Sequence, residues 1–285
     1  MENVALMQLV DDVRDLPLTV SEVLAQVIQE CDNADASVAS LARIMAGDQA
    51  LAAMVLKLAN SAYYGYARKI ESLPDAVVLL GFASVKNLAI TASITRLLAS
   101  DRDEFGSYRR SIFDHSLCTA IGARVLGRAR RISGEKAFVA GLLHDLGLIV
   151  LVCYRKELFR QIVDTMEARQ VGIHEIEEEI LGFSHAELGA LVAAEWKFPP
   201  GLCEALRYHH DPSQAVIDPG LALAVHAGDW LAKRLDVGFV PPVVPEWPHE
   251  LAKTEFELTE TSLPRLEAEI RAEFLEGESL RALAA

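Results

Sequence analysis

The feature that most constrains this sequence is the spacing of its apolar residues, which recur at intervals of three and four along most of the chain. Val20, Val23, Leu24, Val27 and Ile28 are one example, and this spacing places apolar side chains on one face of an α-helix. Alternation of β-branched and polar residues, which is typical of a half-buried strand, is almost absent. Because 51% of the residues are hydrophobic, such helices can bury a large core. The sequence therefore predicts an all-α protein.

Helix caps and breaks divide the first hundred residues into short helices. Asp48 can cap a helix that stops near Gly65, because its carboxylate accepts hydrogen bonds from the first free N–H groups. The segment Ser72–Asp75 predicts another helix start, and Gly81 predicts the end of that helix. The expected helices cover residues 20–28, 38–45, 48–65, 72–81 and 84–98.

Further along the chain, the polar segment 100–106 is the best internal boundary. Pro199-Pro200 and Asp211-Pro212 are firm breaks, since proline disfavours helix in the residue before it. Other helices are expected over residues 112–130, 134–145, 151–169, 173–181, 185–196, 201–210, 221–235 and 263–275. The expected organisation is an N-terminal helical bundle (1–102) packed on a second helical domain (103–236), followed by a proline-rich connector and C-terminal helix (237–285).

The charge of the chain restricts its partners. A formal net charge of −14 argues against a nucleic acid backbone, because such binding depends on clustered Lys and Arg. One basic cluster stands apart from this trend and consists of Arg124, Arg128, Arg130 and Arg131. A solvated helix end, where cations meet the negative pole of the helix dipole, is favoured over a binding patch.

No membrane association is expected, and the protein is placed in the cytoplasm. Charged residues interrupt the first thirty positions, so no signal peptide is expected. No segment reaches the roughly 18 uninterrupted apolar residues of a membrane helix. The cysteines, Cys31, Cys118, Cys153 and Cys203, are scattered, which favours reduced thiols over a disulfide framework.

A set of histidines and aspartates carries the clearest chemical signal. In chain order it reads His115, His144-Asp145, His185, His209-His210 and Asp229. Neutral imidazole and carboxylate are the ligands expected for iron, manganese, zinc or nickel when thiolates are absent. A lone histidine is more often a hydrogen-bonded structural group than a ligand. Seven candidates of these types, each on or at the end of an expected helix, favour a site for one or two divalent metal ions.

In each adjacent pair, His144-Asp145 and His209-His210, the two side chains can point to different ions, because neighbouring residues on a helix point about 100° apart. Asp145 can therefore bridge two ions, and two ions about 3.5–4 Å apart would suit hydrolysis at phosphorus. The remaining histidines have no such role in this interpretation. His174 lies with Glu177 on a helix face expected to be exposed, His226 is at most an outer neighbour of the site, and His249 lies in the connector.

Several motifs agree in order with one family. The segment Gly141–Gly147 (GLLHDLG) resembles the HD motif of metal-dependent phosphohydrolases. Roughly residues 10–235 resemble the HDOD family more closely. Leu56–Gly65 (LKLANSAYYG), preceded by Leu16-Pro17 and a divergent segment 47–51, matches its N-terminal signature. Two further blocks match at Ala76–Gly81 and at His185–Gly189 with Trp196, Pro199 and His209-His210.

The resemblance implies an HD-like helical domain with an extra helical bundle, in a class of bacterial regulators. By analogy with HD enzymes, His115, His144, Asp145 and Asp229 would hold one ion. A second ion would be held by His185, His209 and His210, with Asp145 bridging. The related HD-GYP phosphodiesterases share this ligand order, but they have a lysine where this chain has Leu148 and a Gly-Tyr-Pro loop where it has Asp211-Pro-Ser-Gln. Leucine cannot neutralise a phosphate, which argues against cyclic di-GMP hydrolysis and leaves metal binding intact.

The N-terminal signature has two interpretations. Asn60, Ser61 and Tyr64 could line a cleft, or they could end a helix, because small polar residues compete for backbone bonds and Gly65 permits the turn. The second interpretation is favoured.

Three functions remain open. The leading hypothesis is a signal-transduction protein whose metal site acts by binding, with signalling proteins as partners and a nucleotide or phosphate as a further ligand. The alternative is an active metal-dependent phosphohydrolase or phosphodiesterase, in which Asp145 would be essential. The third is an interaction module with an empty site. Whether the protein is an enzyme is therefore left open, with binding preferred.

Overall fold

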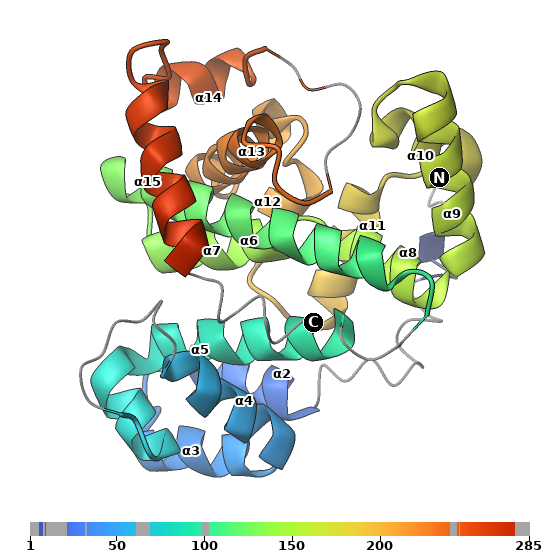
Figure 1. Ribbon diagram of the computed structural model, residues 1–285. Coiled ribbons are helices and arrows are strands. Elements are labelled where there is room, and N and C mark those ends of the chain that lie inside the picture. Colours follow the sequence, from blue (N-terminus) through green and yellow to red (C-terminus); the bar gives the residue numbers. More distant parts are fainter. Residues whose placement is uncertain are drawn as a thin grey trace. The chain divides into compact units, whose positions relative to one another are not determined.

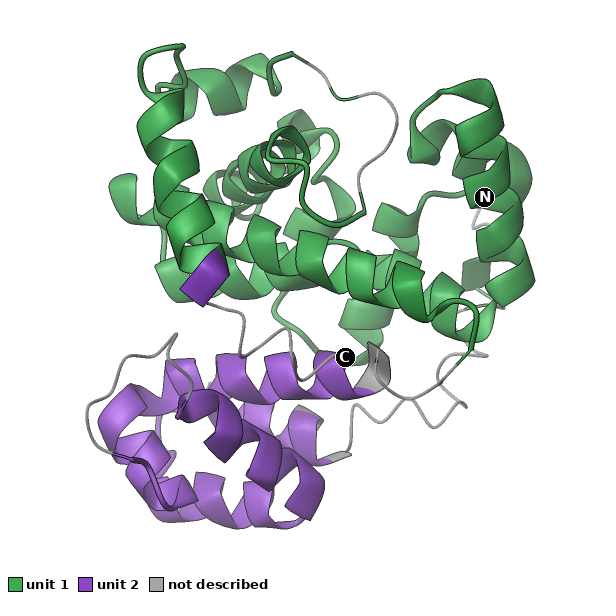
Figure 2. Cartoon of the chain, in the orientation of Figure 1, with its two compact units in different colours: residues 1–17, 101–274 green, residues 18–100, 275–285 purple. Residues whose placement is uncertain are grey.

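Every regular element among the residues described by the computed structural model is a helix (Figure 1), so the all-α prediction is confirmed. The described residues are 6–7, 9, 22–31, 33–60, 69–98, 103–239, 244 and 246–276. The chain forms two units (Figure 2), one made of residues 1–17 and 101–274 and the other of residues 18–100 and 275–285.

In the part of the smaller unit that the structure describes, four helices bury their apolar faces together. They are α2 (Glu22–Cys31), α3 (Val38–Ala46), α4 (Gln49–Ala59) and α5 (Leu73–Leu98). Asp48 caps α4 as expected, because its carboxylate accepts a hydrogen bond from the Leu51 N–H at 3.0 Å. Gly81 interrupts α5 with φ 82° and ψ 164°, which confirms the expected break, since this conformation favours glycine.

Asn60 has a structural role at the end of α4. Its side-chain amide donates to the carbonyls of Leu56 and Ile70 at 2.7 and 2.8 Å and accepts the Ile70 N–H at 2.7 Å. The helix-end interpretation is therefore confirmed for Asn60. Ser61, Tyr64 and Gly65 lie outside the described residues.

The larger unit is built around α6 (Gly106–Ala129), which is buried almost all round from Ile112 to Gly127. The next helices in the chain are α7 (Gly134–Leu143), α8 (Leu146–Tyr154), α9 (Lys156–Arg169), α10 (Ile173–Leu181), α11 (His185–Glu195) and α12 (Pro200–Arg207). They are followed by the short η2 (Pro212–Gln214), α13 (Pro219–Arg234), α14 (Glu250–Glu255) and α15 (Leu263–Glu276). Helix α6 packs against α7 and α13, α8 packs against α11, and α9 packs against α10.

Two features of the helix pattern differ clearly from the expectation. The helix expected over residues 151–169 is two helices, which meet at Arg155, where φ −134° and ψ 50° leave the helical region. This break lets the apolar α8 stay against α11 while α9 turns to pair with α10. Helix α14 was not expected, because its sequence lies within the proline-rich connector.

Part of the arginine cluster has a different role from the one expected. Arg124 forms an ion pair with Glu273 of α15, and Arg130 pairs with Glu257 at 2.7 Å. The interpretation as a solvated helix end is therefore wrong for Arg124, which lies inside α6 and is largely buried in its pair with Glu273. Arg130 is the C-cap of α6, as that interpretation expects, and its partner Glu257 is exposed.

Two stretches, Leu73–Arg96 and Gly134–Tyr154, are long and apolar enough to cross a bilayer by length and composition. Neither stretch is uninterrupted, as expected from the sequence, because Lys86 lies in the first and Asp145 in the second. The second stretch is 89% buried inside the protein and includes the turn at His144 and Asp145 between α7 and α8. Such extensive burial is typical of helices in the core of a protein.

Asp103 fixes the start of α6 and gives a prediction for acid stability. Its carboxylate pairs with Arg109 at 2.7 Å and Lys156 at 2.5 Å, and these cations hold its pKa well below the usual 3.8. A depressed pKa stabilises the fold above about pH 3.8, and this stabilisation is lost as the pH falls further. Asp103→Asn should therefore lower the unfolding free energy at pH 7 by about 1 kcal/mol.

Urea unfolding at pH 7 and near pH 2–3 measures this effect. The difference in unfolding free energy between wild type and Asp103→Asn should be smaller near pH 2–3 than at pH 7. Glu104→Gln is the matched control, because Glu104 forms a largely exposed pair with Arg160, which contributes little. A difference in unfolding free energy that does not change with pH would contradict the role of Asp103.

Candidate metal centre

Close helix crossings through glycine bring the candidate ligands together. A Cβ on Gly147 of α8 would lie 2.0 Å from the carbonyl oxygen of His185 in α11. One on Gly228 of α13 would lie 2.7 Å from the Thr119 carbonyl of α6, and one on Gly141 of α7 would lie 2.7 Å from the Ala120 Cα. Only glycine allows backbones to approach this closely. These contacts set the distances between side chains carried by α6, α7, α8, α11 and α13.

The structure brings all seven candidate residues to one place, and Asp145 lies at its centre. On one side, Asp145 Oδ2 is 3.2 Å from His144 Nε2 and 3.9 Å from His115 Nε2. On the other side, Asp145 Oδ1 is 3.3 Å from His185 Nε2 and 3.8 Å from His209 Nε2.

The two remaining candidates complete these groups. Asp229 Oδ1 lies 2.9 Å from His115 Nε2 and 3.7 Å from His144 Nε2. His210 Nε2 lies 3.0 Å from His185 Nε2. The ligand atoms of His115, His144 and Asp145 lie within 4.8 Å of one another, and so do those of His185, His209 and His210.

Three of the rings, those of His115, His144 and His209, have a contact between Nδ1 and a backbone carbonyl. His144 Nδ1 donates to the Gly141 carbonyl at 2.8 Å, and His209 Nδ1 donates to the Leu206 carbonyl at 2.7 Å. His115 Nδ1 lies 3.3 Å from the Val237 carbonyl. In metalloproteins, a hydrogen bond of this kind fixes the tautomer and directs the lone pair of Nε2 at the ion.

The orientation of His144 and His209 leaves two buried nitrogens without a partner. Their Nε2 atoms are fully buried and make no hydrogen bond within the described part of the chain. With Nδ1 as the donor, each Nε2 is a lone pair that faces the Asp145 carboxylate. An orphaned acceptor beside a buried carboxylate is unfavourable unless a cation lies between them. The donor set therefore fits a divalent metal ion.

When no ion is bound, protons on the histidine rings supply the positive charge that balances the buried carboxylates. Burial alone would lower the pKa of His144, but the carboxylates of Asp145 and Asp229 outweigh it and raise the pKa to about 9. In His185, burial is likewise outweighed by Glu177 and Asp145, which raise the pKa to about 10. Burial lowers the pKa of His209, which keeps that ring neutral and suited to an ion. An arriving ion must displace the bound protons, so metal binding should strengthen as the pH rises.

Glu177 is a candidate site residue that the sequence analysis missed, and its expected exposure was wrong. It is fully buried, and its Oε2 accepts hydrogen bonds from His185 Nδ1 at 2.6 Å and from the His185 backbone N–H at 2.9 Å. It lies among four glutamates at 175–179, which look like a solvated helix face. The helical spacing from the buried Ile173 and Ile176 is the only signal that could have singled it out.

Glu177→Gln should weaken metal binding by about 10–100-fold while the protein stays folded. The amide can no longer stabilise the ring of His185 as the carboxylate does, and losses of this size are typical when such outer partners are removed. Competition with a metal chelator measures the affinity. Glu178→Gln is the control, because Glu178 is exposed on the same helix. Equal affinities in the two variants would contradict the role of Glu177.

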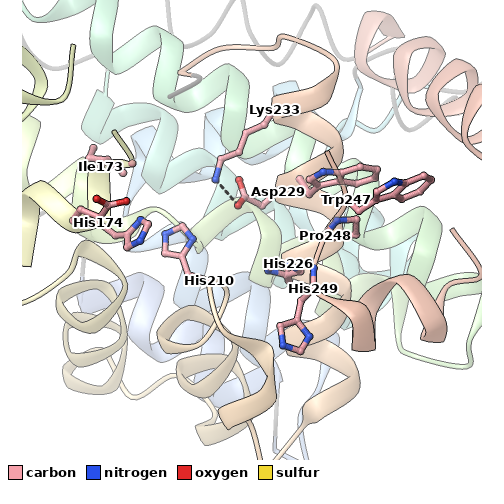
Figure 3. A pocket seen from close by; sticks show the side chains of 12 residues that line it. Ile173, His174, His210, His226, Asp229, Lys233, Trp247, Pro248 and His249 are labelled. Atoms are coloured by element: carbon pink, nitrogen blue, oxygen red, sulfur yellow. Dashed lines mark hydrogen bonds and ion pairs between the residues drawn. The ribbon is translucent and has the colours of Figure 1, made fainter. Parts of the chain in front are cut away.

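A pocket of about 340 Å³ lies beside the candidate ligands. In Figure 3, His174 and His210 face one another, and Lys233 reaches Asp229. Lys233 Nζ donates to Asp229 Oδ2 at 2.7 Å, and the rings of His174 and His210 are 5.6 Å apart. The interpretation of His174 as a residue without a role is therefore incomplete, because it lines this pocket. His226, expected to be an outer neighbour at most, donates to the His209 carbonyl at 2.7 Å.

Comparisons with known proteins support one family. A family model described as HDOD domain matches residues 16–212. Among solved structures, a candidate phosphohydrolase from Shewanella amazonensis SB2B has a TM-score of 0.77 at 24% identity, and the match covers 100% of this chain and 99% of that chain. At this identity the likeness shows the fold alone.

Two other solved structures are 25% identical to this chain. An HDOD domain protein of unknown function from Geobacter sulfurreducens has a TM-score of 0.75, with 98% of this chain and 96% of that chain covered. A candidate signal transduction protein from Marinobacter aquaeolei VT8 has a TM-score of 0.73, with 96% and 60% covered. An uncharacterized protein of Treponema pallidum (strain Nichols) is 27% identical over 207 residues, or 71% of this chain, and the match spans 38% of that relative's length.

Proposed function

This chain belongs to the HDOD domain family, and we propose that it is a bacterial regulatory protein that acts by binding through a divalent metal centre rather than by catalysis. The observation that carries the metal centre is the pair of buried, unpartnered Nε2 atoms of His144 and His209, both facing Asp145. A buried lone pair beside a carboxylate calls for a cation.

The residues divide into two groups that share Asp145. His115, His144, Asp145 and Asp229 would hold one ion, and His185, His209 and His210 would hold a second ion together with Asp145. Iron, manganese, zinc and nickel suit this mixture of imidazole and carboxylate. Such an ion would supply positive charge and Lewis acidity.

A binding role is supported by the surroundings of the aspartate. Leu148, three residues after Asp145, is buried and apolar, so this turn of α8 offers no cation to a phosphate. The Marinobacter relative is named as a signal transduction protein. We therefore propose that signalling proteins in the cytoplasm are the partners.

The second candidate function is that of a metal-dependent phosphohydrolase or phosphodiesterase. It is favoured by the full set of seven candidate ligands around one space. In that case Asp145 would orient both ligand groups, and loss of its carboxylate would abolish turnover.

Metal analysis of untreated protein, followed by a screen of nucleotides and cyclic dinucleotides with added manganese or iron, separates these functions. Bound metal without turnover is the result expected for a regulator. Turnover that disappears in Asp145→Ala would establish the phosphohydrolase instead. Protein that binds no metal under any of these conditions would overturn both.

A further inference from the structure

His226 of α13 uses both of its ring nitrogens inside the protein. Its Nδ1 donates to the carbonyl of His209 at 2.7 Å, and its Nε2 accepts the backbone N–H of His249 at 2.9 Å. A backbone N–H can only donate, so the proton of the neutral ring lies on Nδ1. His226 therefore connects the backbone of a candidate metal ligand with a segment 23 residues further along the chain.

That segment, residues 247–249, forms a strap along one wall of the pocket beside the candidate metal centre (Figure 3). The strap is irregular in conformation, and Pro248 at its centre is buried. His210 and Asp229 line the same pocket. The strap therefore lies beside both ligand groups, one of which contains His210 and the other Asp229.

An aromatic contact fixes the first residue of the strap. The rings of Trp247 and Trp230 stack with their centroids 6.0 Å apart, and Trp230 is buried directly after Asp229 in α13. One end of the strap is thus fixed to the neighbour of a candidate ligand, and the His249 end is fixed through His226 to another ligand.

The hydrogen bond to His226 also bears on the next helix, because His249 is the N-cap of α14. The ring of His249 accepts the Leu251 N–H at 3.2 Å, and α14 has only six residues. So short a helix depends on its cap and on packing, because helix nucleation is unfavourable. Displacement of His249 would therefore loosen α14 together with the strap.

An ion would fix the end of this chain of contacts that lies in the metal centre. His209 lies two residues beyond the last residue of α12. Its Nδ1 donates to the Leu206 carbonyl, and its Nε2 has no hydrogen-bond partner in the described part of the chain. An ion bound at Nε2 would give the ring a second anchor. The position of the His209 carbonyl, which holds His226, would then be restricted.

We propose that the strap is a conformational switch whose closed position is stabilised by a filled metal centre, and that His226 is the positioning residue that couples the two. The proposal rests on the metal centre proposed above. Loss of the ion shifts the population toward an open strap and a loosened α14. Since α14 carries the half-exposed Leu251, occupancy of a buried centre would change a surface that a protein partner can contact.

Hydrogen exchange of single amides, followed by nuclear magnetic resonance with saturating manganese and without metal, tests the coupling. The N–H of His249 is bonded to His226, so its exchange reports opening of the strap. Manganese should slow this exchange in wild-type protein by at least about fivefold, the lower end of typical coupling between two sites.

His226→Gln separates the two hydrogen bonds of His226. The amide oxygen of glutamine lies near the position of Nε2 and can accept the His249 N–H, but no donor remains at the position of Nδ1. The His249 amide should stay partly protected, and manganese should no longer change its exchange. His174→Gln is the matched control, because His174 lines the opposite side of the same pocket (Figure 3). It should keep the full manganese effect.

Linkage provides an independent measurement from the other end of the strap. If manganese stabilises the closed strap by some factor, closure must strengthen manganese binding by the same factor. Trp247→Ala removes the stacking on Trp230, so manganese affinity should fall by up to this factor in competition with a chelator. Val216→Ala, at a side chain that is 81% exposed, should keep the affinity of the wild type.

Three results would overturn the proposal and leave the metal centre itself standing. The first is equal exchange of the His249 amide in loaded and metal-free wild-type protein. The second is a full manganese effect in His226→Gln, and the third is equal manganese affinity in Trp247→Ala and Val216→Ala. Wild-type protein that takes up no metal would overturn this proposal and the proposed function together.

Discussion

Replacing Asp145 with alanine should remove nearly all bound metal and lower the unfolding temperature of the metal-loaded protein by about 5–10 °C. Asp145 faces both ligand groups, with His144 Nε2 3.2 Å from one oxygen and His185 Nε2 3.3 Å from the other. An ion present at about 100 times its dissociation constant stabilises a protein by about 2.7 kcal/mol. Elemental analysis and scanning calorimetry of the same sample measure both effects.

Asp164→Ala is the control for this experiment, because Asp164 is exposed on α9. It should retain the metal content and unfolding temperature of the wild type. Equal metal content in Asp145→Ala and Asp164→Ala would show that Asp145 is not a ligand and that the assignment of both groups is wrong.

The second large effect is expected at Gly147, where alanine should destabilise the fold by about 3 kcal/mol or more. Its Cβ would lie 2.0 Å from the His185 carbonyl oxygen and 2.8 Å from the His185 Cα. Both are backbone atoms, so α8 and α11 would have to separate. That separation would also move His185 away from Asp145, so metal binding should weaken together with stability. Urea unfolding and metal content measure the two losses.

Gly220→Ala is the matched control. Gly220 also lies in a helix, α13, but its Cβ would be 3.4 Å from the nearest atom, a side-chain carbon of Ile132. Alanine favours helix over glycine by about 1 kcal/mol, so this variant should be neutral or slightly more stable. If Gly147→Ala were as stable as Gly220→Ala, the close crossing of α8 and α11 would not constrain the fold.

The helical nature of the fold could be predicted because local signals agree with the tertiary structure. Asp48 caps its helix and Gly81 breaks one, as their residue types predict. The break at Arg155 could not be predicted, because no glycine or proline marks it and the apolar pattern continues through it. Tertiary packing decides that position, as α8 and α9 pair with different helices.

The candidate site was predicted where residue type alone carries the chemistry. The His144-Asp145 and His209-His210 pairs can be recognised from the sequence alone. Glu177 and Lys233 cannot, because glutamates and lysines on amphipathic helices are usually solvated. Their roles arise from burial and from distances to His185 and Asp229, which only the folded chain defines.

The contacts that hold the ring nitrogens of His144, His185 and His209 have a consequence for ion selectivity. The conformational entropy of these side chains is lost when the chain folds, so an ion bound at the proposed centre would meet a preorganised set of ligands. The spacing of the ligands is then fixed before binding, and ions are distinguished by their radius and preferred coordination geometry. Exchanging one divalent ion for another should therefore change the affinity while the helices keep the same arrangement.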